Sequence, residues 1–454
     1  MRTRLTAFLL AFSFVFSPVA ASAEMLPPPP PEQEFPEGLS SCFDYYTFGS
    51  IPVSLEGGTD TVAAGTDMVL AGKVRNDNSY PVSGLKIYAK LLQIDTEEKT
   101  VDGPDVVDDF LVSDTVAFGE EYPSKGFTLL PDEEKNFTLS YSLPAALKDG
   151  IYRVALYVIA NDRFNMTGLS FTDDVIGTNY GFTVVGGGDG TLRFERSSFT
   201  VGGEKHHFVA FPTSMRDTGA TRVEGVVTND ASAALSGMLM WTLYRWDQRR
   251  DAQMIETRTI PVSVAAGGSL PVTFDVNDER YTVYQLVGRL VTDRGTSIIN
   301  VRMKQPGANE PRINFQGITE KDGALTAFAC VHNTGDAKML EDTKVVLSVS
   351  SSGYLGREFA KKTYFGSVPG QIAALSMPVS IFMPEKSILI TTTLERGGKV
   401  VDSVTSKYSC QDLNVCSPIT FEWALVILTL LIVLGGGFLL FRKRRMIGGG
   451  TNTV

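Results

Sequence analysis

The sequence predicts an all-β protein, with three tandem β-sandwich modules followed by one C-terminal transmembrane helix. Three observations predict this fold. Strand-length segments alternate apolar and polar residues with a period of two, as half-buried strands do. One strand–turn–strand pattern occurs three times, and an apolar segment stands near each end of the chain. Helical periodicity is nearly absent between those two ends.

The repeated pattern is a strand, an asparagine turn and a second strand. It begins with "LAGKVRND" from Leu70, with "VEGVVTND" from Val223 and with "VHNTGD" from Val331. Asparagine and aspartate suit such turns because their side chains bond nearby backbone groups and tolerate left-handed conformations. Asn229 and Asn333 lie 104 residues apart, which is the length of one immunoglobulin-like sandwich. The repeats therefore predict modules at residues 40–187, 188–305 and 310–409.

The two ends of the chain predict its location. Residues 1–23 have a positive start, a short apolar stretch and the small-residue site "ASA", as secretory signals do. Residues 24–39 contain five consecutive prolines and predict an extended spacer. Residues 421–441 are long and apolar enough to cross a bilayer. We predict a single-pass protein of the cell membrane with its N-terminus on the extracytoplasmic side.

Residues around the predicted membrane helix support this orientation. Trp423 stands where an interfacial aromatic anchor is expected, and a basic cluster follows the helix directly. A juxtamembrane segment at 410–420 precedes the helix, and the tail at 442–454 is expected in the cytoplasm, where such clusters belong. The cluster consists of Arg442, Lys443, Arg444 and Arg445.

The repeated segments resemble a known family. "AGTDMVLAGKVRNDNSYPVSGLKIYAKLL", "FACVHNTGDAKMLEDTKVVLSV" and the later "DGIYRVALYV" are similar to CARDB-type and related immunoglobulin-like modules of prokaryotic surface proteins. The resemblance covers roughly residues 40–410. The chain departs from the family's turn motif at Asn76 and Asn229, where no glycine follows. The resemblance implies a surface spacer or adhesion module, and it brings no catalytic residues with it.

Composition narrows the classes of partner. The net charge of −10 argues against nucleic acid, which calls for a clustered basic face. An insertion at 95–121 in the first module is rich in acidic residues, and we expect a solvated acidic loop there. A calcium site is the alternative, because hard cations bind several oxygen ligands. Its ligands would be Asp102, Asp105, Asp108 and Asp109, and no other cofactor is expected.

Four cysteines and two sequons complete the candidate residues. In an extended rod of modules Cys42 cannot reach the other cysteines, so we expect it to be free or intermolecular. A disulfide is then expected among Cys330, Cys410 and Cys416, on the oxidising side of the membrane. Asn136 ("NFT") and Asn165 ("NMT") are acceptors for glycosylation only if the host modifies such sequons.

The functional prediction follows from the repeats, the anchor and the lack of a catalytic motif. We expect a non-enzymatic, membrane-anchored surface protein, a stalk for adhesion or envelope structure that presents its N-terminal module. Its partner would be a protein or a surface polysaccharide. The alternative is an extracytoplasmic accessory or receptor subunit that binds a membrane protein in cis.

Overall fold

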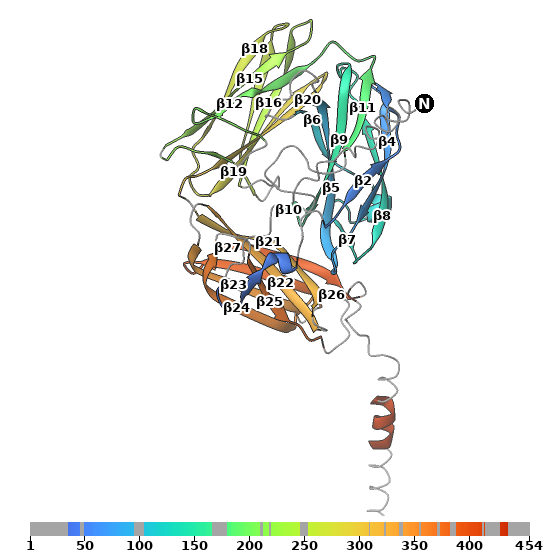
Figure 1. Cartoon of the computed structure of the whole chain (residues 1–454), viewed down its shortest axis with the longest axis vertical. Helices are drawn as coiled ribbons and strands as arrows, with labels where there is room; N and C mark the ends of the chain where they lie inside the picture. Colours follow the sequence, from blue (N-terminus) through green and yellow to red (C-terminus); the bar gives the residue numbers. More distant parts are fainter. Residues whose placement is uncertain are drawn as a thin grey trace, which may run out of the picture. The chain divides into compact units, whose positions relative to one another are not determined.

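The computed structural model describes residues 35–45, 50–94, 104–165, 179–208, 212–217, 219–245, 253–307, 309–321, 324–335, 339–353, 356–369, 373–381, 387–410, 413 and 427–434. These residues form β-strands almost throughout (Figure 1). The described exceptions are a 3-10 turn, η1 (Cys42–Asp44), a short helix, α2 (Thr115–Phe118), and helical residues at 427–434. The predicted all-β class is confirmed.

The strands of residues 50–187 enclose one apolar core between two sheets. A three-stranded sheet has the order β2 (Val53–Glu56), β4 (Asp67–Arg75) and β8 (Glu134–Ser142). Opposite it lie β3 (Thr61–Ala63), β5 (Val82–Ile94), β6 (Asp105–Leu111), β7 (Phe127–Leu129), β9 (Gly150–Ala160), β10 (Phe164–Asn165) and β11 (Asn179–Val185). Alternate residues of β4, such as Leu70 and Val74, are buried against Ile87 and Val154. This is the period of two that the sequence showed.

The strands of residues 192–304 enclose a second core. One sheet has the order β13 (Glu204–Lys205), β12 (Leu192–Val201), β15 (Thr221–Asn229) and β18 (Ser269–Val276). Facing it are β14 (Thr213–Ser214), β16 (Leu235–Arg245), β17 (Met254–Val264), β19 (Val283–Thr292) and β20 (Gly295–Lys304). Trp241, Phe194, Phe199 and Phe274 fill the space between the sheets.

These first two sets of strands share one sheet. Its order runs β17-β16-β19-β20-β6-β5-β9-β11-β3, so β20 of the second set pairs with β6 of the first. The pairing joins Ile298 to Val106, and both side chains are buried in a small apolar cluster of their own. β6 lies inside the acidic insertion, at 105–111, where we expected a loop. Its two consecutive valines, Val106 and Val107, bury their side chains, and β5 and β20 pair with its two edges.

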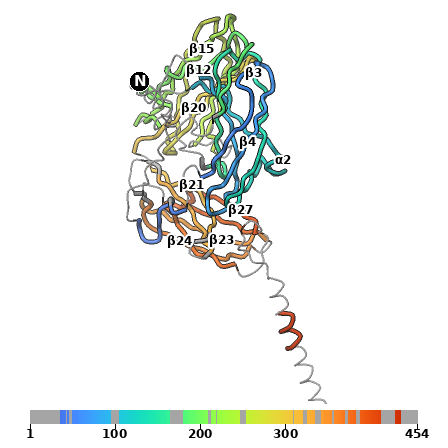
Figure 2. The backbone as a smooth tube through the Cα atoms, turned by 45° about the vertical axis from the view of Figure 1, so that its right-hand side comes forward, coloured from blue at the N-terminus to red at the C-terminus, as the bar shows by residue number. Residues whose placement is uncertain are grey.

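The last strands, at residues 309–409, enclose a third core. One sheet has the order β24 (Glu358–Pro369), β23 (Met339–Ser351), β26 (Ser387–Arg396) and β27 (Lys399–Ser409). The facing sheet has the order β1 (Leu39–Ser41), β25 (Ala373–Pro378), β22 (Ala324–Gly335) and β21 (Asn309–Lys321). Figure 2 shows the blue N-terminal segment among these orange strands.

The position of β1 differs from the predicted boundary at residue 40, which placed Leu39 in the spacer and Ser40 and Ser41 in the first module. β1 pairs antiparallel with β25, and Leu39 and Phe35 pack on the third core. An unpaired strand edge exposes hydrogen-bonding groups, and a short added strand satisfies them. The N-terminal segment is therefore part of the third set of strands.

The repeated asparagines have the same structural role in the first two copies. The buried Asn76 amide donates to Tyr80 O (2.8 Å) and Leu129 O (3.1 Å) and accepts from Asn78 N (2.9 Å). The Asn229 amide donates to three carbonyls, those of Ala233, Val264 and Ala265, and accepts from Ala231 N. Each asparagine thus binds its own turn to the turn of a neighbouring strand pair. Asn333 of the third copy is also buried.

Much of the predicted membrane anchor lies outside the described residues. Residues 427–434 are helical, and their apolar side chains from Ile427 to Leu434 are exposed. Within the part of the chain that the structure describes, no helix is long and apolar enough to cross a membrane. The predicted signal at 1–23, the tail at 442–454 and the residues Trp423, Arg442, Lys443, Arg444 and Arg445 fall outside that part.

Candidate functional site

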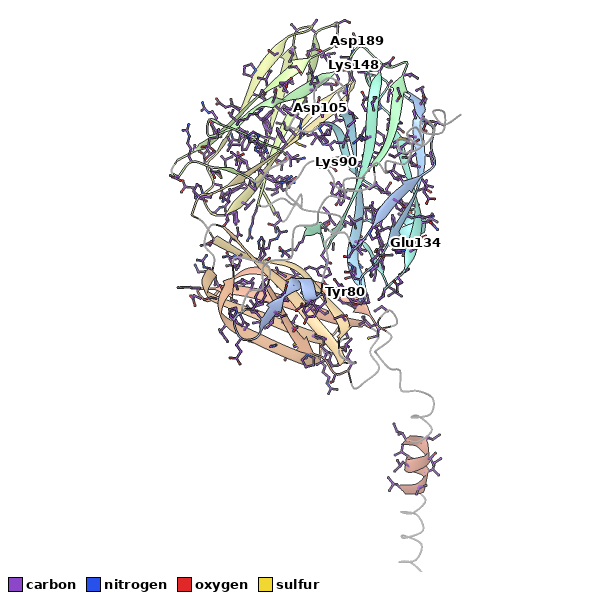
Figure 3. The ribbon with its side chains drawn as sticks, viewed as in Figure 1. Tyr80, Lys90, Asp105, Glu134, Lys148 and Asp189 are labelled. Carbon is purple, nitrogen blue, oxygen red and sulfur yellow. A yellow bond between two sulfur atoms is a disulfide. The ribbon has the colours of Figure 1, made fainter. Side chains whose placement is uncertain are left out.

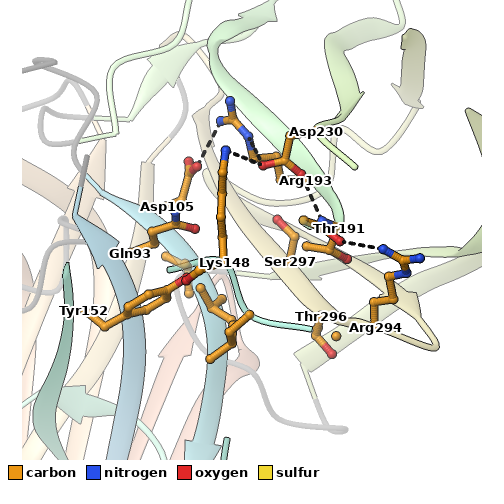
Figure 4. Close-up of a pocket in the computed structure, with 15 residues that line it drawn as sticks. Gln93, Asp105, Lys148, Tyr152, Thr191, Arg193, Asp230, Arg294, Thr296 and Ser297 are labelled. Atoms are coloured by element: carbon orange, nitrogen blue, oxygen red, sulfur yellow. Dashed lines mark hydrogen bonds and ion pairs between the residues drawn. The ribbon is translucent and has the colours of Figure 1, made fainter. Parts of the chain in front are cut away.

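A small polar pocket lies where the first set of strands meets the second (Figure 4). Its centre is Arg193 on β12. Arg193 Nη1 donates to Asp105 Oδ2 at 3.1 Å, and Arg193 Nε lies 3.6 Å from Asp230 Oδ2. Lys148 Nζ approaches the same Asp230 oxygen to 3.8 Å. We call Asp105, Lys148, Arg193 and Asp230 the Arg193 cluster. Figure 3 labels Asp105 and Lys148 near the meeting of the two sets of strands.

Local structure places each member of this cluster. Asp105 is the first residue of β6, and Arg193 pairs across to Thr228 of β15. Asp230 follows the turn-locking Asn229, and its Oδ1 accepts from Thr191 N at 2.9 Å. Gly190 has φ +115°, and a Cβ there would lie 2.7 Å from Asp230 Oδ1. Glycine is needed at 190 because both the backbone conformation and the close carboxylate exclude a side chain.

The electrostatics of the cluster come from burial and from compensating charges. Burial raises the pKa of Asp105, although Arg193 and Arg196 oppose that shift. Burial would lower the pKa of Arg193, but Asp105, Asp230 and Glu195 outweigh it and raise that pKa. Two cations and two carboxylates therefore neutralise one another where β6, β12 and the turn after β15 meet. These charged contacts hold the first set of strands to the second.

A second group lies at the rim of the same pocket. Asp189 pairs with Arg294 and accepts hydrogen bonds from the hydroxyl and backbone N–H of Ser232. The hydrogen bonds from the Ser232 hydroxyl and N–H lower the pKa of Asp189, and Arg294 lowers it further, to about 2. Asp189 is therefore ionised at any physiological pH. It connects the segment before β12 to the turn that follows β15.

A buried ion pair joins the first set of strands to the third. Arg163 donates from Nη1 to Asp402 Oδ2 at 2.7 Å and from Nη2 to Asp402 Oδ1 at 2.5 Å, in a bidentate arrangement. Both side chains are at most 7% exposed. Asp402 also accepts from Ile313 N, and Arg312 donates to Arg163 O. Burial opposes ionisation of Asp402, but Arg163 and Ile313 N–H outweigh it and lower its pKa.

A disulfide fixes the segment between β1 and β2 to β22 of the third set of strands. Cys42 is bonded to Cys330, across 288 residues of sequence, with their Cα atoms 5.6 Å apart. The prediction that Cys42 is free or intermolecular is therefore wrong. Of the three cysteines among which a disulfide was predicted, Cys330 is excluded, because it is bonded to Cys42. Cys410 is disulfide-bonded as well, and Cys416 lies outside the described residues.

The reason for this error is the assumption of an extended rod. Phe328, two residues before Cys330, is fully buried in an apolar cluster that it shares with residues from the first part of the chain. Tyr45 stacks on its ring at 4.6 Å between centroids, and Tyr80 meets it edge-on at 5.2 Å. Such aromatic contacts add to the burial of apolar area. They hold the N-terminal segment and the Asn76 turn against the third set of strands.

The link between the second and third sets of strands has its own ion pair. Arg245, at the end of β16, pairs with Glu310 at the start of β21. Glu310 Oε2 also accepts from Thr282 N at 3.1 Å. The Arg245 guanidinium lies over the Tyr281 ring, 4.8 Å from its centroid. These contacts fix the start of β21 against the second set of strands.

The structure separates the carboxylates of the calcium alternative. Asp105 pairs with Arg193, and Asp108 accepts from Tyr141 Oη at 3.0 Å and from Arg289 at 3.3 Å. Asp109 accepts from Tyr157 Oη at 2.8 Å. Successive strand residues point to opposite faces, so Asp108 and Asp109 diverge. Asp102 lies outside the described residues, and among those described no group of three metal-ligating side chains is able to hold an ion.

The two sequons lie on different strands of the first set. Asn136 is an exposed residue of β8. Asn165 ends β10, and the residues that complete its sequon, 166 and 167, lie outside the described part of the chain. Only the first sequon is therefore described as a whole.

Sequence reasoning missed Arg163, Asp402 and Arg193. Single charged residues in strands form no motif, and their partners lie far away along the chain. One signal was available for Asp402. In "KVVDSVTSKY" the period of two places Asp402 on the same face as Val404 and Tyr408, which is the inward face. A carboxylate at an inward strand position predicts a buried cationic partner.

Comparisons with known proteins identify similar structures but no family. No family model matches the chain, and no curated protein sequence matches it. Among solved structures, α2-macroglobulin from E. coli is similar over 80% of this chain at 11% identity and a TM-score of 0.30. α2-Macroglobulin from Salmonella is similar over 81% at 12% identity and a TM-score of 0.28. The chain spans 22% and 24% of these two proteins.

CARDB domains, which the sequence resembles, are among the similar structures. The CARDB domain of a Pyrococcus furiosus protein is similar over 34% of this chain, and all of that domain is covered. The identity is 16% and the TM-score is 0.19. The likeness concerns β-sandwich domains, and no activity of these proteins is transferred to this chain.

Proposed function

We propose that the chain is a non-enzymatic, membrane-anchored surface protein for adhesion or envelope structure. In this proposal its three tandem β-sandwich modules are joined as one body on the extracytoplasmic side. The observation that carries the proposal is the Cys42–Cys330 disulfide. Disulfides between distant parts of a chain form and persist in oxidising compartments. The N-terminal signal pattern and the apolar segment at 421–441 agree with export and retention at the membrane.

The contacts between modules refine the expected stalk. The first module meets the third through the Arg163–Asp402 pair and the second through the Arg193 cluster, and the disulfide fixes the segment that leads into the first module to the third. Each contact is buried or half-buried and chemically specific. In a stalk that holds its first module away from the other two, these contacts would not form. We therefore propose a surface body with fixed internal geometry, suited to present the same face repeatedly to a partner.

The location is tested on intact cells. We expect external protease to digest the exported part of the chain, and we expect the full chain to remain in the membrane fraction after high-salt washing. Thiol reagents are expected to leave Cys42 and Cys330 unlabelled until a reductant is added. A chain that is protected from external protease, or that labels at Cys42 without reductant, overturns the proposal.

The kind of partner is tested by crosslinking in cells, followed by mass spectrometry of the intact protein. An adhesive or envelope role predicts crosslinks to another cell's surface or to a polymer, and these survive when the anchor at 421–441 is removed. Crosslinks confined to one membrane protein and dependent on residues 310–441 would identify the alternative, an accessory subunit that acts in cis. That result overturns the adhesive role and leaves the membrane location intact.

A further inference from the structure

We propose that Asn136 carries an N-linked oligosaccharide, and that its first sugars lie in a groove between β4 and α2. The inference rests on the export that the proposed function includes. It concerns a covalent modification and the surface that receives it, which neither the fold nor the repeats imply.

The sequon has its reactive side chains on one exposed face. Asn136, Phe137 and Thr138 are consecutive residues of β8, so Phe137 points to the core while Asn136 and Thr138 point outward together. Phe137 is 3% exposed, whereas Asn136 and Thr138 are exposed. Among the residues that the structure describes, none hydrogen-bonds the Asn136 amide. β8 is also an edge strand, so solvent reaches the amide from the side.

A groove lies directly beside this amide. Asn136 and Thr138 line it, and Lys73, which is the cross-strand neighbour of Asn136, forms its floor with Ala71. Its charged groups are the Lys73–Glu56 pair at 2.9 Å and Asp114, and Val116 and Ala117 of α2 also line it. Sugar hydroxyls bond such charged groups, and the CH faces of sugar rings pack on apolar side chains.

Helix α2 presents an apolar side chain to this groove. Val116 is 96% exposed, the highest value among the large apolar residues that the structure describes. α2 is held in place by Asp114, which caps its first turn by accepting from Val116 N and Ala117 N. The second oxygen of Asp114 accepts from Thr138 N at 2.7 Å, inside the sequon. The chain thus fixes an exposed valine beside the sequon, and an attached sugar would cover it.

The modification is a group transfer with a defined donor class. The Asn136 amide nitrogen forms a bond to the anomeric carbon of a polyprenyl-pyrophosphate-linked oligosaccharide. The bond between that carbon and the pyrophosphate oxygen breaks, and the pyrophosphate leaves with its electron pair. The amide loses one proton, which the pyrophosphate or solvent takes up. No oxidant or reductant takes part.

The site is tested on the full chain purified from the membranes of its own cells. Peptide mass spectrometry is expected to find hexose or hexosamine additions on the Asn136 peptide of the wild type. T138S keeps the sequon and should keep the additions, whereas T138A and N136Q should lose them. T138A and T138S leave the backbone N–H that bonds Asp114 in place. An unmodified Asn136 peptide in the wild type, or additions that persist in T138A, overturns the inference.

The protease assay on intact cells distinguishes failure of the glycosylation inference from failure of the proposed surface location. An accessible chain with unmodified Asn136 overturns the inference alone. An inaccessible chain with unmodified Asn136 overturns both.

The groove is tested by hydrogen exchange on the purified glycoprotein before and after enzymatic removal of Asn-linked glycans. Removal is expected to speed exchange in the peptide that contains Val116 and Ala117 several-fold. A peptide from β18, in the second set of strands, serves as the internal control and should not change. Equal exchange of the α2 peptide in both forms overturns the placement of the sugars in the groove.

Discussion

Asn229 determines the local structure of its turn because its one side chain hydrogen-bonds four backbone groups at once. Its amide bonds three carbonyls from two separate turns and accepts from Ala231 N. A buried carbonyl that loses its donor keeps the cost of leaving water. The same arrangement around Asn76 explains why the repeat keeps asparagine where the residues beside it vary.

Replacing Asn229 by alanine therefore tests the turn. We expect N229A to lower the free energy of unfolding by about 2–3 kcal/mol, because the buried Val264 carbonyl and the carbonyls of Ala233 and Ala265 lose their donor. N277A, at an exposed asparagine after β18, is the control and should change stability by less than about 0.5 kcal/mol. The measurement is the urea midpoint of the purified chain. Equal effects of the two variants would contradict the assigned role.

Gly225 allows close packing of an aromatic ring. A Cβ at this position would lie 2.4 Å from Phe199 Cζ, and the matching Gly72 would meet Phe137 at 2.3 Å. We expect G225A to destabilise by about 1–3 kcal/mol through overpacking. F199L in the same chain should recover part of that loss, because the smaller side chain leaves room. G181A, whose Cβ has ordinary contacts, is the control. Thermal unfolding measures all three.

The Arg163–Asp402 pair makes stability depend on pH in the acid range. Because the pKa of Asp402 is lower in the folded chain, the unfolded chain binds more protons there. The pair's contribution to the free energy of unfolding is therefore complete above the pKa of aspartate in the unfolded chain, about 3.9. It is lost as pH falls through the lower pKa of Asp402 in the folded chain. We expect D402N to flatten this acid loss in urea titrations from pH 7 down to pH 3.

D402N also leaves Arg163 buried without a counter-charge, which costs about 3–5 kcal/mol at neutral pH. The double variant R163M/D402L removes both charges and should recover most of that cost. An acid loss of the same size in wild type and D402N would show that other carboxylates cause it.

At the scale of elements, strands take their place from partners that are distant in sequence. β1 has only three residues, and it is stable because β25 bonds it and Cys42 fixes the turn that follows. β6 has three acidic and four apolar or aromatic residues, and its acidic residues predicted a loop, yet it joins the first two sets of strands into one sheet. Short strands of this kind have little stability alone.

Removing the disulfide tests the attachment of β1. We expect the C42A/C330A variant to unfold at lower temperature, with a loss of about 2–5 kcal/mol, because the bond closes a long loop in the unfolded chain. Wild type in reductant should unfold at the same temperature as the variant in reductant. Calorimetry measures this, and the comparison in reductant removes the contribution of the disulfide at Cys410. An unchanged midpoint in the variant would contradict the attachment.

At the scale of the whole chain, the charged contacts couple regions that have separate cores. The first set of strands contacts the second through the Arg193 cluster and the third through Arg163, and the Cys42–Cys330 bond fixes the segment before β2 to the third. Two regions unfold together when the contacts between them contribute more to the stability of each region than that region has by itself.

We expect the first two regions to unfold in a single calorimetric peak in the wild type and in two peaks in R193M. The reason is that Asp105 and Asp230 lose their shared cation in R193M. R222M removes a surface ion pair with Asp275 inside the second region and is the matched control. It should leave the number of transitions unchanged, since exposed pairs contribute about 0–1 kcal/mol. Identical thermograms for both variants would contradict the coupling.

The sequence by itself determined the class of fold and the local structure of the repeats. Alternation along β4 and β15 predicted which side chains enter the cores, because strand geometry alone sets that period. The asparagine turns were predictable for the same reason, since their hydrogen bonds begin within a few residues.

Only the tertiary structure decided how the regions meet. Cys42 pairs with Cys330, and Arg163 pairs with Asp402, over separations that no local pattern records. The assumption of a rod led to the wrong cysteine pairing. The physical reason is that a strand's own period states which face is buried, whereas the residue that covers that face comes from elsewhere in the chain.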